Sequence, residues 1–489
     1  MKKILYLVIF LPTFIFAQEA EEANMLFNWD DTDIPGSFAY DNAYNEIWGF
    51  VANNREFAVI GSTLGTHFVD VTDPANSVEL TNAYVQGATS SPIVIHRDYH
   101  DYQCYLYAVA DEGNNSTLQI IDISDMPYSN SVVYDSPAAI RTSHNIFIDS
   151  TNAILYACHV TFTSNNSTQY YRLAAFSLAD PVNPTLIQGY SVIDGVSIPV
   201  IHDIHVRDNI AFLNGSYDGL LVVDFTDPTN PDLLTNLDTY PQQGYNHSGW
   251  LSDDGNYYFM ADETHNLDIK VYDVSDLTDI QLVTTFDAES TEMGSIAHNL
   301  LVRGNYLYAS YYYDGLQVYD ISDPTMPRRV AYFDTYPGTN ILSYEGAWGV
   351  YPFLPSGNIL ISDMQTGLYV FEKIDETITG QMDLLGTPTN CSVATTSVID
   401  FEEGLVFASV YPQPFGSEFM LEMELEEQQE ARITMTDISG KEVLDMGTRV
   451  LSAGIQTHRF NVPSAFANGL YMLRITGEKT HFVRKIVKQ

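Results

Sequence analysis

The stretch that decides the fold is Gly219-Leu-Leu-Val-Val-Asp224-Phe-Thr-Asp227-Pro228. Its four central residues form a short apolar run bounded by turn residues, which is typical of a fully buried strand. Gly219 before the run and Asp227-Pro228 after it are turn signals, because glycine tolerates positive φ and proline presets φ. The segment therefore predicts a short β-strand between two turns.

The same phrase recurs along the chain. Five copies carry an aspartate at the end of the predicted strand, at Asp70, Asp122, Asp224, Asp273 and Asp320. A third-repeat copy has Ser177 at that point, and a seventh copy after Gly367 lacks the Asp-Pro exit. Because an acceptor at a fixed turn satisfies backbone donors there, we interpret the repeated aspartates as structural.

A second marker precedes each copy of the phrase. It is histidine in five repeats and Trp-Gly in the first and last, at positions 48, 96, 144, 202, 247, 298 and 348. A period of about 50 residues with about four strands per unit is typical of a β-propeller. Helical solenoids are excluded, because the apolar residues alternate with period two and Asp-Pro turns punctuate them.

We therefore expect an all-β chain, with a seven-bladed β-propeller followed by a small β-sandwich-like C-terminal domain. The seventh repeat lacks a fourth strand after Glu372, and residues 25–29 form a spare strand before the first repeat. Pairing of these two segments would close the ring and remove sheet edges. The expected parts are a signal peptide at 1–17, the propeller at 18–380, a linker at 381–404 and the last domain at 405–489.

The charge is unevenly distributed. The chain has 63 acidic and 21 basic residues, a net charge of −42, yet residues 405–489 are nearly neutral. The acidity therefore belongs to the predicted propeller, and it excludes nucleic acid as a partner, because phosphate binding needs clustered Lys and Arg. A hydrophobic fraction of 45% argues against disorder.

The N-terminal residues and the number of cysteines give information on the cellular location of the protein. Lys2 and Lys3 precede an uncharged apolar run at 4–17 and then acidic residues, a pattern that indicates a secretory signal peptide. No other run is long and apolar enough for a transmembrane segment. Three cysteines form no disulfide framework. We interpret Cys104 and Cys158 as buried thiols, and Cys391 falls in the predicted linker.

The C-terminal segment carries several motifs in a fixed order: Val410-Tyr-Pro-Gln-Pro-Phe415, Asp437-Ile-Ser-Gly-Lys441, Leu451-Ser-Ala-Gly454, Asn468-Gly-Leu-Tyr-Met-Leu-Arg-Ile475 and a basic end at 484–488. It resembles the C-terminal sorting domain of the type IX secretion system of Bacteroidetes, with Gln413 where asparagine is usual. The resemblance implies contact with the secretion machinery and export to the outer cell surface or the extracellular space. The residues that carry it are Pro412, Pro414, Phe415, Gly440, Gly469, Tyr471 and Lys485.

The repeat phrase, above all Leu220-Leu-Val-Val-Asp224, resembles the LVIVD repeat. The whole arrangement is similar to the choice-of-anchor B family of secreted repeat proteins. In that family the propeller-like part stays similar while the attachment signal varies. The resemblance implies a fold and an extracellular location, and no particular activity.

The recurring histidines are the sharpest candidates for chemistry. First strands line the channel of a propeller, so equivalent residues of successive blades converge near the axis. The candidate metal ligands are His96, His144, His202, His247, His298, Glu46 and Glu345. Imidazole with carboxylate suits Zn, Fe, Mn or Cu. Asp98, His205 and Asp262-Glu263 add to the polar set. Alternatively, each histidine serves its own blade by a structural hydrogen bond.

Calcium is a second metal to consider in so acidic a chain. An EF-hand-like loop begins at Asp31, but Pro35 and Asn42 break its ligand pattern, so that loop is rejected. Weak calcium binding among acidic surface loops stays open.

Two functions are therefore carried forward. The first is a secreted or surface-attached binding or scaffold module whose ligand is a protein or a glycan, with aromatic residues such as 311–313 available for stacking. The alternative is a metal-dependent enzyme that uses the channel histidines. No Walker A loop, nucleophile elbow or His-Glu-x-x-His motif is present, and no catalytic residue is assigned.

Overall fold

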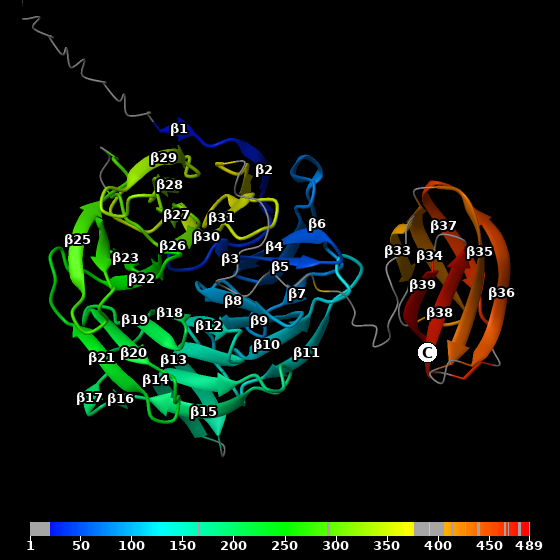
Figure 1. The fold of residues 1–489 in the computed structure, drawn as a ribbon, viewed down its shortest axis with the longest axis horizontal. Helices are drawn as coiled ribbons and strands as arrows, with labels where there is room; N and C mark the ends of the chain where they lie inside the picture. The colour runs from blue at the N-terminus through cyan, green and yellow to red at the C-terminus, as the bar shows by residue number, and fades with distance from the viewer. Residues whose placement is uncertain are drawn as a thin grey trace, which may run out of the picture. The chain divides into compact units, whose positions relative to one another are not determined.

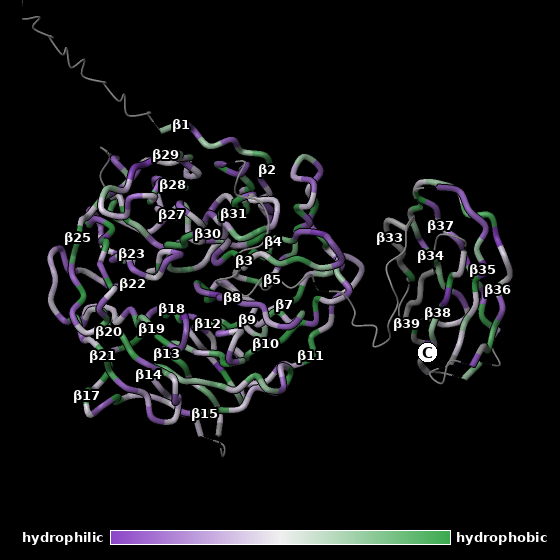
Figure 2. The backbone as a smooth tube through the Cα atoms, in the orientation of Figure 1, coloured by the Kyte–Doolittle hydropathy of each residue, from purple (hydrophilic) through white to green (hydrophobic). Residues whose placement is uncertain are grey.

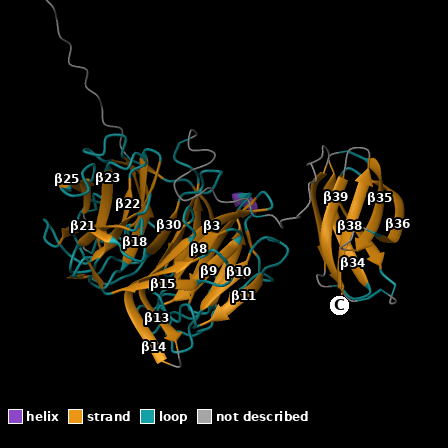
Figure 3. Cartoon of the chain, turned by 60° about the horizontal axis from the view of Figure 1, so that its bottom comes forward, coloured by secondary structure: helices purple, strands orange, loops and turns teal. Residues whose placement is uncertain are grey.

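The computed structural model describes residues 20–164, 167–290, 294–375, 391, 405–411, 415–425, 427–437, 441–463, 466–467, 469–477 and 481–488. The chain divides into two compact units, Met1–Cys391 and Ser392–Gln489. Strands dominate both units, and the single helical element among the described residues is the 3₁₀ turn η1 (Pro74–Asn76) (Figure 3).

The described residues of the first unit form seven sheets of four or more strands, one for each predicted repeat. From the centre outward, the first sheet contains β3 (Tyr44–Ala52), β4 (Arg55–Ser62), β5 (Gly65–Asp70) and β6 (Val78–Glu79), and β7 (Val85–Gln86) also pairs with β5. The second contains β8 (Arg97–Tyr102), β9 (Tyr105–Ala110), β10 (Leu118–Asp122) and β11 (Ser131–Ser136). The third contains β12 (Asn145–Asp149), β13 (Ile154–Ser164), β14 (Ser167–Ser177) and β15 (Thr185–Tyr190).

The next three sheets repeat this order. They are β18 (Asp203–Arg207), β19 (Ile210–Asn214), β20 (Leu220–Asp224) and β21 (Asp232–Leu237); β22 (Asn246–Leu251), β23 (Tyr257–Asp262), β24 (Ile269–Asp273) and β25 (Gln281–Phe286); and β26 (Leu300–Arg303), β27 (Tyr306–Ser310), β28 (Leu316–Asp320) and β29 (Arg328–Phe333). A small hairpin of β16 (Val192–Ile193) and β17 (Val196–Ser197) lies between the third and fourth sheets in sequence.

The last sheet closes the ring with an N-terminal strand. It contains β30 (Ala347–Tyr351), β31 (Ile359–Asp363) and β32 (Gly367–Phe371), and β2 (Met25–Trp29) pairs antiparallel with β32. The predicted closure by residues 25–29 is confirmed. A parallel pairing of β1 (Glu21–Glu22) with β29 extends the neighbouring sheet and was not predicted.

The innermost strands contact one another in the closed order β3, β8, β12, β18, β22, β26, β30 and back to β3. The sheets therefore surround a central axis, as in a β-propeller (Figure 1). Hydrophobic stretches run along strands such as β10 and β20 (Figure 2), and buried clusters fill the spaces between adjacent sheets.

The second unit is a separate β domain. One sheet contains β33 (Leu405–Tyr411), β34 (Glu418–Leu425) and β37 (Gly454–Asn461); the other contains β36 (Glu442–Leu451), β35 (Gln429–Asp437), β38 (Gly469–Gly477) and β39 (His481–Lys488). One apolar cluster includes residues of both sheets, among them Phe419 and Ile433. The domain therefore has a core of its own.

Cys391 departs from its predicted place. Sequence reasoning put it in a linker, whereas it is fully buried and forms a parallel bridge with Ala52 at the end of β3. Its N–H donates to Val51 O (2.8 Å) and its carbonyl accepts from Asn53 N (2.7 Å). The composition of residues 381–404 does not reveal this contact, because backbone hydrogen bonds to the propeller are independent of residue type.

Candidate functional site

Five histidines and one tryptophan form a closed ring of side chains at one end of the axial channel. Neighbouring ring centroids are 4.8 Å (His96–His144), 4.1 Å (His144–His202), 3.9 Å (His202–His247), 4.2 Å (His247–His298), 4.6 Å (His298–Trp348) and 5.3 Å (Trp348–His96) apart. We call this set the histidine ring.

The repeat explains why these residues meet. Each histidine lies at the entry of an innermost strand or within two residues of it, and the innermost strands run in the same sense around the axis. Equivalent positions therefore collect at the same end of the channel. Trp348 takes the ring position in the last sheet, whereas Trp48 of the first sheet lies deeper, stacked on His100 at 4.4 Å.

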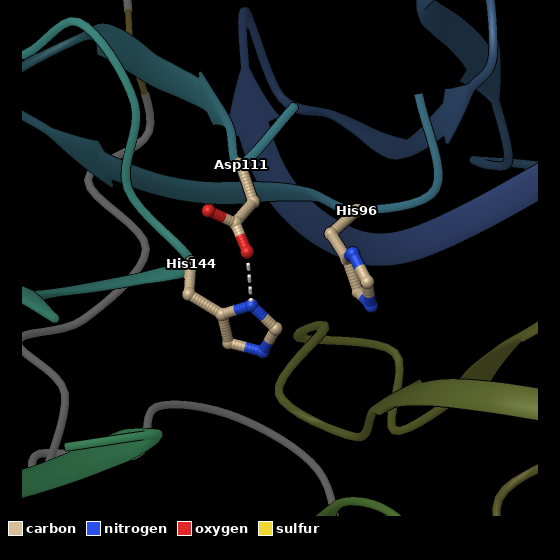
Figure 4. A group of neighbouring side chains, drawn as sticks. All are labelled: His96, Asp111 and His144. Carbon is tan, nitrogen blue, oxygen red and sulfur yellow. Dashed lines mark hydrogen bonds and ion pairs between the residues drawn. The ribbon is translucent and has the colours of Figure 1, made fainter. Parts of the chain in front are cut away.

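Carboxylates hold two of the ring imidazoles. His144 Nδ1 lies 2.8 Å from Asp111 Oδ2, and His96 Nδ1 lies 2.5 Å from Glu112 Oε1 (Figure 4 shows the first pair). With Nδ1–H donated to a carboxylate, Nε2 carries the lone pair, the form that binds metal in carboxylate–histidine–zinc arrangements. In His144 this Nε2 lies 2.6 Å from Nε2 of His202. His96, Asp111 and His144 each offer a ligand atom within 4.8 Å of the others.

A second group lies next to the first in the ring. His202, His247 and Glu263 also offer ligand atoms within 4.8 Å of one another. Glu263 Oε1 accepts a hydrogen bond from Tyr312 Oη (2.5 Å), and Glu263 Oε2 lies 3.8 Å from His247 Nε2. Burial raises the pKa of Glu263 to about 7, opposed by the bond from Tyr312 and by the field of His144.

Two ring nitrogens have no hydrogen-bond partner although they are buried. They are Nδ1 of His202 and Nδ1 of His247, whose residues are 9% and 2% exposed. Burial, and then repulsion from neighbouring histidines, holds the pKa of both imidazoles well below the usual range. Both are therefore neutral near pH 7, which is the form that binds metal. Burial likewise lowers the pKa of His298 to about 3, while its Nδ1 donates to Trp348 O (2.6 Å).

Buried carboxylates form a second layer beneath the ring, the carboxylate layer. It contains Glu46, Asp98 and Asp203, with the amides of Asn145 and Asn299. Burial raises the pKa of Glu46 and of Asp203 to about 7, and burial together with the charge of Glu46 raises that of Asp98. A cation in the channel would reverse these shifts, because it stabilises the ionised form. The ring and this layer enclose a cavity of about 20 Å³, room for about one water-sized species.

Aromatic side chains close the channel below the carboxylate layer. Centroid distances of 4.2 to 5.9 Å link them into a second closed circle, the aromatic plug: Trp48, His100, Phe147, His205, Trp250, Phe353 and Tyr351. Asp98 and His100 alternate along β8, and His96 directly precedes that strand. Because alternate residues face the same side, one of these three side chains lies in each of the three layers. The channel is therefore accessible from the histidine-ring end, where the side chains of His96 and His144 are 24% and 16% exposed.

The predicted ligands are only partly brought together. The five histidines meet, and Glu46 lies one layer below them. Glu345 instead accepts from Tyr336 Oη and does not line this cavity. Sequence reasoning missed Asp111 and Glu112. They directly follow β9, as Glu263 follows β23, and this shared position after a second strand was the available signal.

The repeated aspartates lie at turns, away from the ring. Each accepts the backbone N–H two residues on: Asp70 from Thr72 (3.2 Å), Asp122 from Ser124 (3.0 Å), Asp224 from Thr226 (2.7 Å), Asp273 from Ser275 (3.0 Å) and Asp320 from Ser322 (3.0 Å). Tyr311, Tyr312 and Tyr313, expected as stacking residues, are each 1% exposed and therefore buried. Their position at a strand end does not reveal whether such side chains are exposed or buried.

Half-buried and exposed aromatic side chains instead lie beside the histidine ring. Tyr245 packs on His202 at 5.4 Å and on Tyr217 at 5.0 Å, and Tyr217 is 72% exposed. Tyr344 packs on Tyr312 at 5.6 Å.

Several residues of the sorting motifs have defined places in the second unit. Phe415 is fully buried, Gly469 begins β38, Tyr471 Oη donates to Ala467 O (2.8 Å), and Lys485 lies on β39 opposite Met472. Pro412, Pro414 and Gly440 lie outside the described residues, as do residues 1–19 with the predicted signal peptide.

Comparison with family models identifies both parts of the chain. The LVIVD repeat matches residues 201–239, 248–288 and 294–335. The chain therefore contains three matched LVIVD repeats within a β-propeller fold. The secretion system C-terminal sorting domain matches residues 409–489, so the chain also carries a type IX sorting domain, which indicates secretion to the cell surface or the extracellular space. In the described part of the chain, the longest apolar elements are strands, and no helix could span a membrane.

Solved structures that match this chain share little of its sequence. A putative 6-phosphogluconolactonase from Bacteroides uniformis is 12% identical, with 86% of this chain and 100% of that chain covered and a TM-score of 0.46. The periplasmic gluconolactonase of Pseudomonas aeruginosa is 12% identical over 86% and 99%, with a TM-score of 0.44. The computationally designed Ika8 protein is 11% identical over 72% and 98%, with a TM-score of 0.42. A search of curated proteins gives no match.

Proposed function

We propose that this chain is an exported, seven-bladed propeller that binds a divalent transition-metal ion at the accessible end of its axial channel. One observation carries the proposal: the five imidazoles line a space of about 20 Å³, and Asp111 and Glu263 complete two groups of three residues whose ligand atoms lie within 4.8 Å of one another. A purely structural ring would be expected to satisfy its own nitrogens, yet Nδ1 of His202 and Nδ1 of His247 are buried without partners.

The donor set favours transition metals over calcium. Calcium takes six to eight oxygen ligands, whereas neutral imidazole nitrogen suits Zn, Fe, Mn and Cu. The carboxylate layer lies directly beneath and adds charge that attracts a cation. Zinc is therefore the probe for the test.

The test measures bound zinc in the full chain. The protein is purified without chelators or a metal-binding tag, equilibrated with Zn²⁺, dialysed and assayed for metal. We expect stoichiometric zinc and a rise in the unfolding temperature that EDTA abolishes. The double variant His144→Ala with His202→Ala removes one imidazole from each group and should lower zinc affinity about 100-fold or more.

His265→Ala is the matched control, because His265 lies outside the ring and bonds Ser343 O (3.0 Å). This variant should keep its zinc. Absence of zinc in the unmodified protein, or full retention in the double variant, would overturn the proposal.

A second candidate function, metal-assisted hydrolysis, follows from the ligand count. Each group offers three protein ligands, and catalytic zinc sites keep a fourth position open for water. Protein loaded with Co²⁺ reports this position by its visible spectrum. A spectral change on adding azide supports an exchangeable site. A spectrum that azide leaves unchanged contradicts it and leaves a metal-binding module, with the aromatic rim around Tyr217 as the contact surface for a protein or a glycan.

Surface delivery has its own test. We propose that a signal peptide at 1–17 and the C-terminal domain together direct export, as in the choice-of-anchor B arrangement. A chain ending at residue 404 should accumulate in the periplasm of a type IX-competent host, and the full chain should reach the surface. Surface delivery of the shortened chain would refute the assignment of the tail as the sorting signal.

A further inference from the structure

Cys391 is fixed to the propeller by its backbone. It forms a one-residue parallel bridge with Ala52, held by hydrogen bonds to Val51 and Asn53 on either side of that residue. Its side chain is fully buried among apolar residues of the first and second sheets. The side chain therefore has one defined position.

Cys104 lies at the edge of the apolar cluster that buries Cys391. It lies in the tight turn between β8 and β9 with φ of 67°, and Ile123 N donates to its carbonyl (3.0 Å). Its side chain packs against the same apolar cluster as Cys391, and the two thiols are joined by a hydrogen bond. Two cysteines far apart in the sequence thus place their sulfur atoms in contact.

The location is separate from the histidine ring. Cys104 lies two residues after the end of β8, whereas His96 directly precedes its first residue, so the two lie at opposite ends of that strand. Chemistry at the thiols therefore leaves the candidate metal ligands in place, and its test is independent of metal binding.

We propose that Cys104 and Cys391 form a disulfide in the exported protein. Secreted proteins pass through an oxidising compartment in which paired thiols are converted to disulfides. The two S–H bonds break and one S–S bond forms. Two electrons and two protons pass to a disulfide oxidant, which is reduced to two thiols. The bond fixes the chain just before the sorting domain to the propeller.

The buried setting indicates when the bond forms. The hydrogen bond with Cys104, together with burial, raises the pKa of the Cys391 thiol. A thiol held protonated exchanges slowly, so oxidation is fastest while the chain is still folding. The bond should therefore be present in protein recovered from an oxidising compartment.

Tryptic mapping of the full chain tests the bond directly. Protein exported by its host is purified without reductant, incubated with oxidised glutathione, denatured and alkylated. Trypsin places Cys104 in peptide 98–141, Cys391 in 374–432 and Cys158 in 142–172. We expect a cross-link between the first two peptides and an alkylated Cys158. Alkylation of all three cysteines, or a cross-link that includes Cys158, would overturn the proposal.

Matched variants provide a second readout. Cys104→Ser should leave Cys391 alkylatable, and Cys158→Ser should keep the cross-link. Reduction should lower the denaturant midpoint of the unmodified protein and of Cys158→Ser, but not of Cys104→Ser. A midpoint insensitive to reductant in the unmodified protein contradicts the bond even if every variant folds.

Discussion

Nε2 of His144 and Nε2 of His202 lie 2.6 Å apart, although 58 residues separate them in the chain. His144 gives its Nδ1 proton to Asp111, so its Nε2 is an acceptor. His202 must then donate from Nε2, which leaves its buried Nδ1 without a partner. A cation bound at this Nδ1 would give its lone pair a partner, and this is a physical argument for the metal hypothesis.

Asp111→Asn tests the carboxylate of the first group. The amide keeps the shape but loses the negative charge. Burial raises the pKa of Asp111, yet the hydrogen bond and field of His144 more than offset it, so the native group is ionised. We expect zinc affinity to fall about 10- to 100-fold, measured by competition with a chromogenic chelator. Asp122→Asn removes the same charge from a turn of the same sheet and should have no effect; equal losses in both variants would contradict the role of Asp111.

His100→Phe tests the aromatic plug through pH. Burial lowers the pKa of His100 to about 4, while the unfolded chain takes up the proton near pH 6.5. Acidification through this window therefore favours the unfolded state, and His100 should cost the protein about 2–3 kcal/mol of unfolding free energy between pH 7 and pH 4.5. Urea unfolding at both pH values should show a smaller acid loss for His100→Phe, and identical acid losses would refute the prediction.

Asp70→Ala tests the structural reading of the repeated aspartates. Asp70 is 5% exposed and accepts from Thr72 N (3.2 Å), Thr72 Oγ1 (2.7 Å) and Arg55 Nε (2.6 Å). Loss of a buried acceptor should lower the unfolding free energy by about 2 kcal/mol. Asp70→Asn keeps an acceptor, and Arg55 is half exposed, so this variant should lose about 1 kcal/mol or less. Denaturant curves that rank the two variants equally would count against a turn role.

Removal of β2 tests ring closure. Asn28 Nδ2 donates to Thr366 O and Leu368 O, both at 3.0 Å, and Phe27 and Trp29 pack on the core between the last and first sheets. A mature chain beginning at Asp31 loses these contacts and exposes the edge of β32. Its unfolding free energy should fall by roughly 4 kcal/mol, with association visible by light scattering. A control chain beginning at Asn24 keeps β2 and should remain monodisperse; similar behaviour of the two chains would show that closure by β2 is dispensable.

Particular strands and side chains show how much of the structure could be predicted from the sequence. The strand predicted to end at Asp320 is β28, which ends at that residue, because turn residues bound its apolar run. The histidines are expected on the first strands, whereas His298 precedes β26, which begins at Leu300. Glu345 was chosen because it precedes Trp348-Gly349 in sequence, yet its partner is Tyr336. The closeness of Glu345 to Trp348 in sequence does not determine the direction of its side chain, because the residue lies in a loop.

By itself, the sequence determined the repeat, the strand order within each sheet, the closing N-terminal strand and the sorting domain. Each of these follows from local periodicity, turn chemistry or a motif of fixed spacing. Only the tertiary structure decided which atoms meet at the axis. Asp111 and Glu263 reach the histidine ring, Glu46 lies beneath it, and Cys391 lies against Cys104. These contacts join residues from different sheets, and their distances depend on how the whole ring closes.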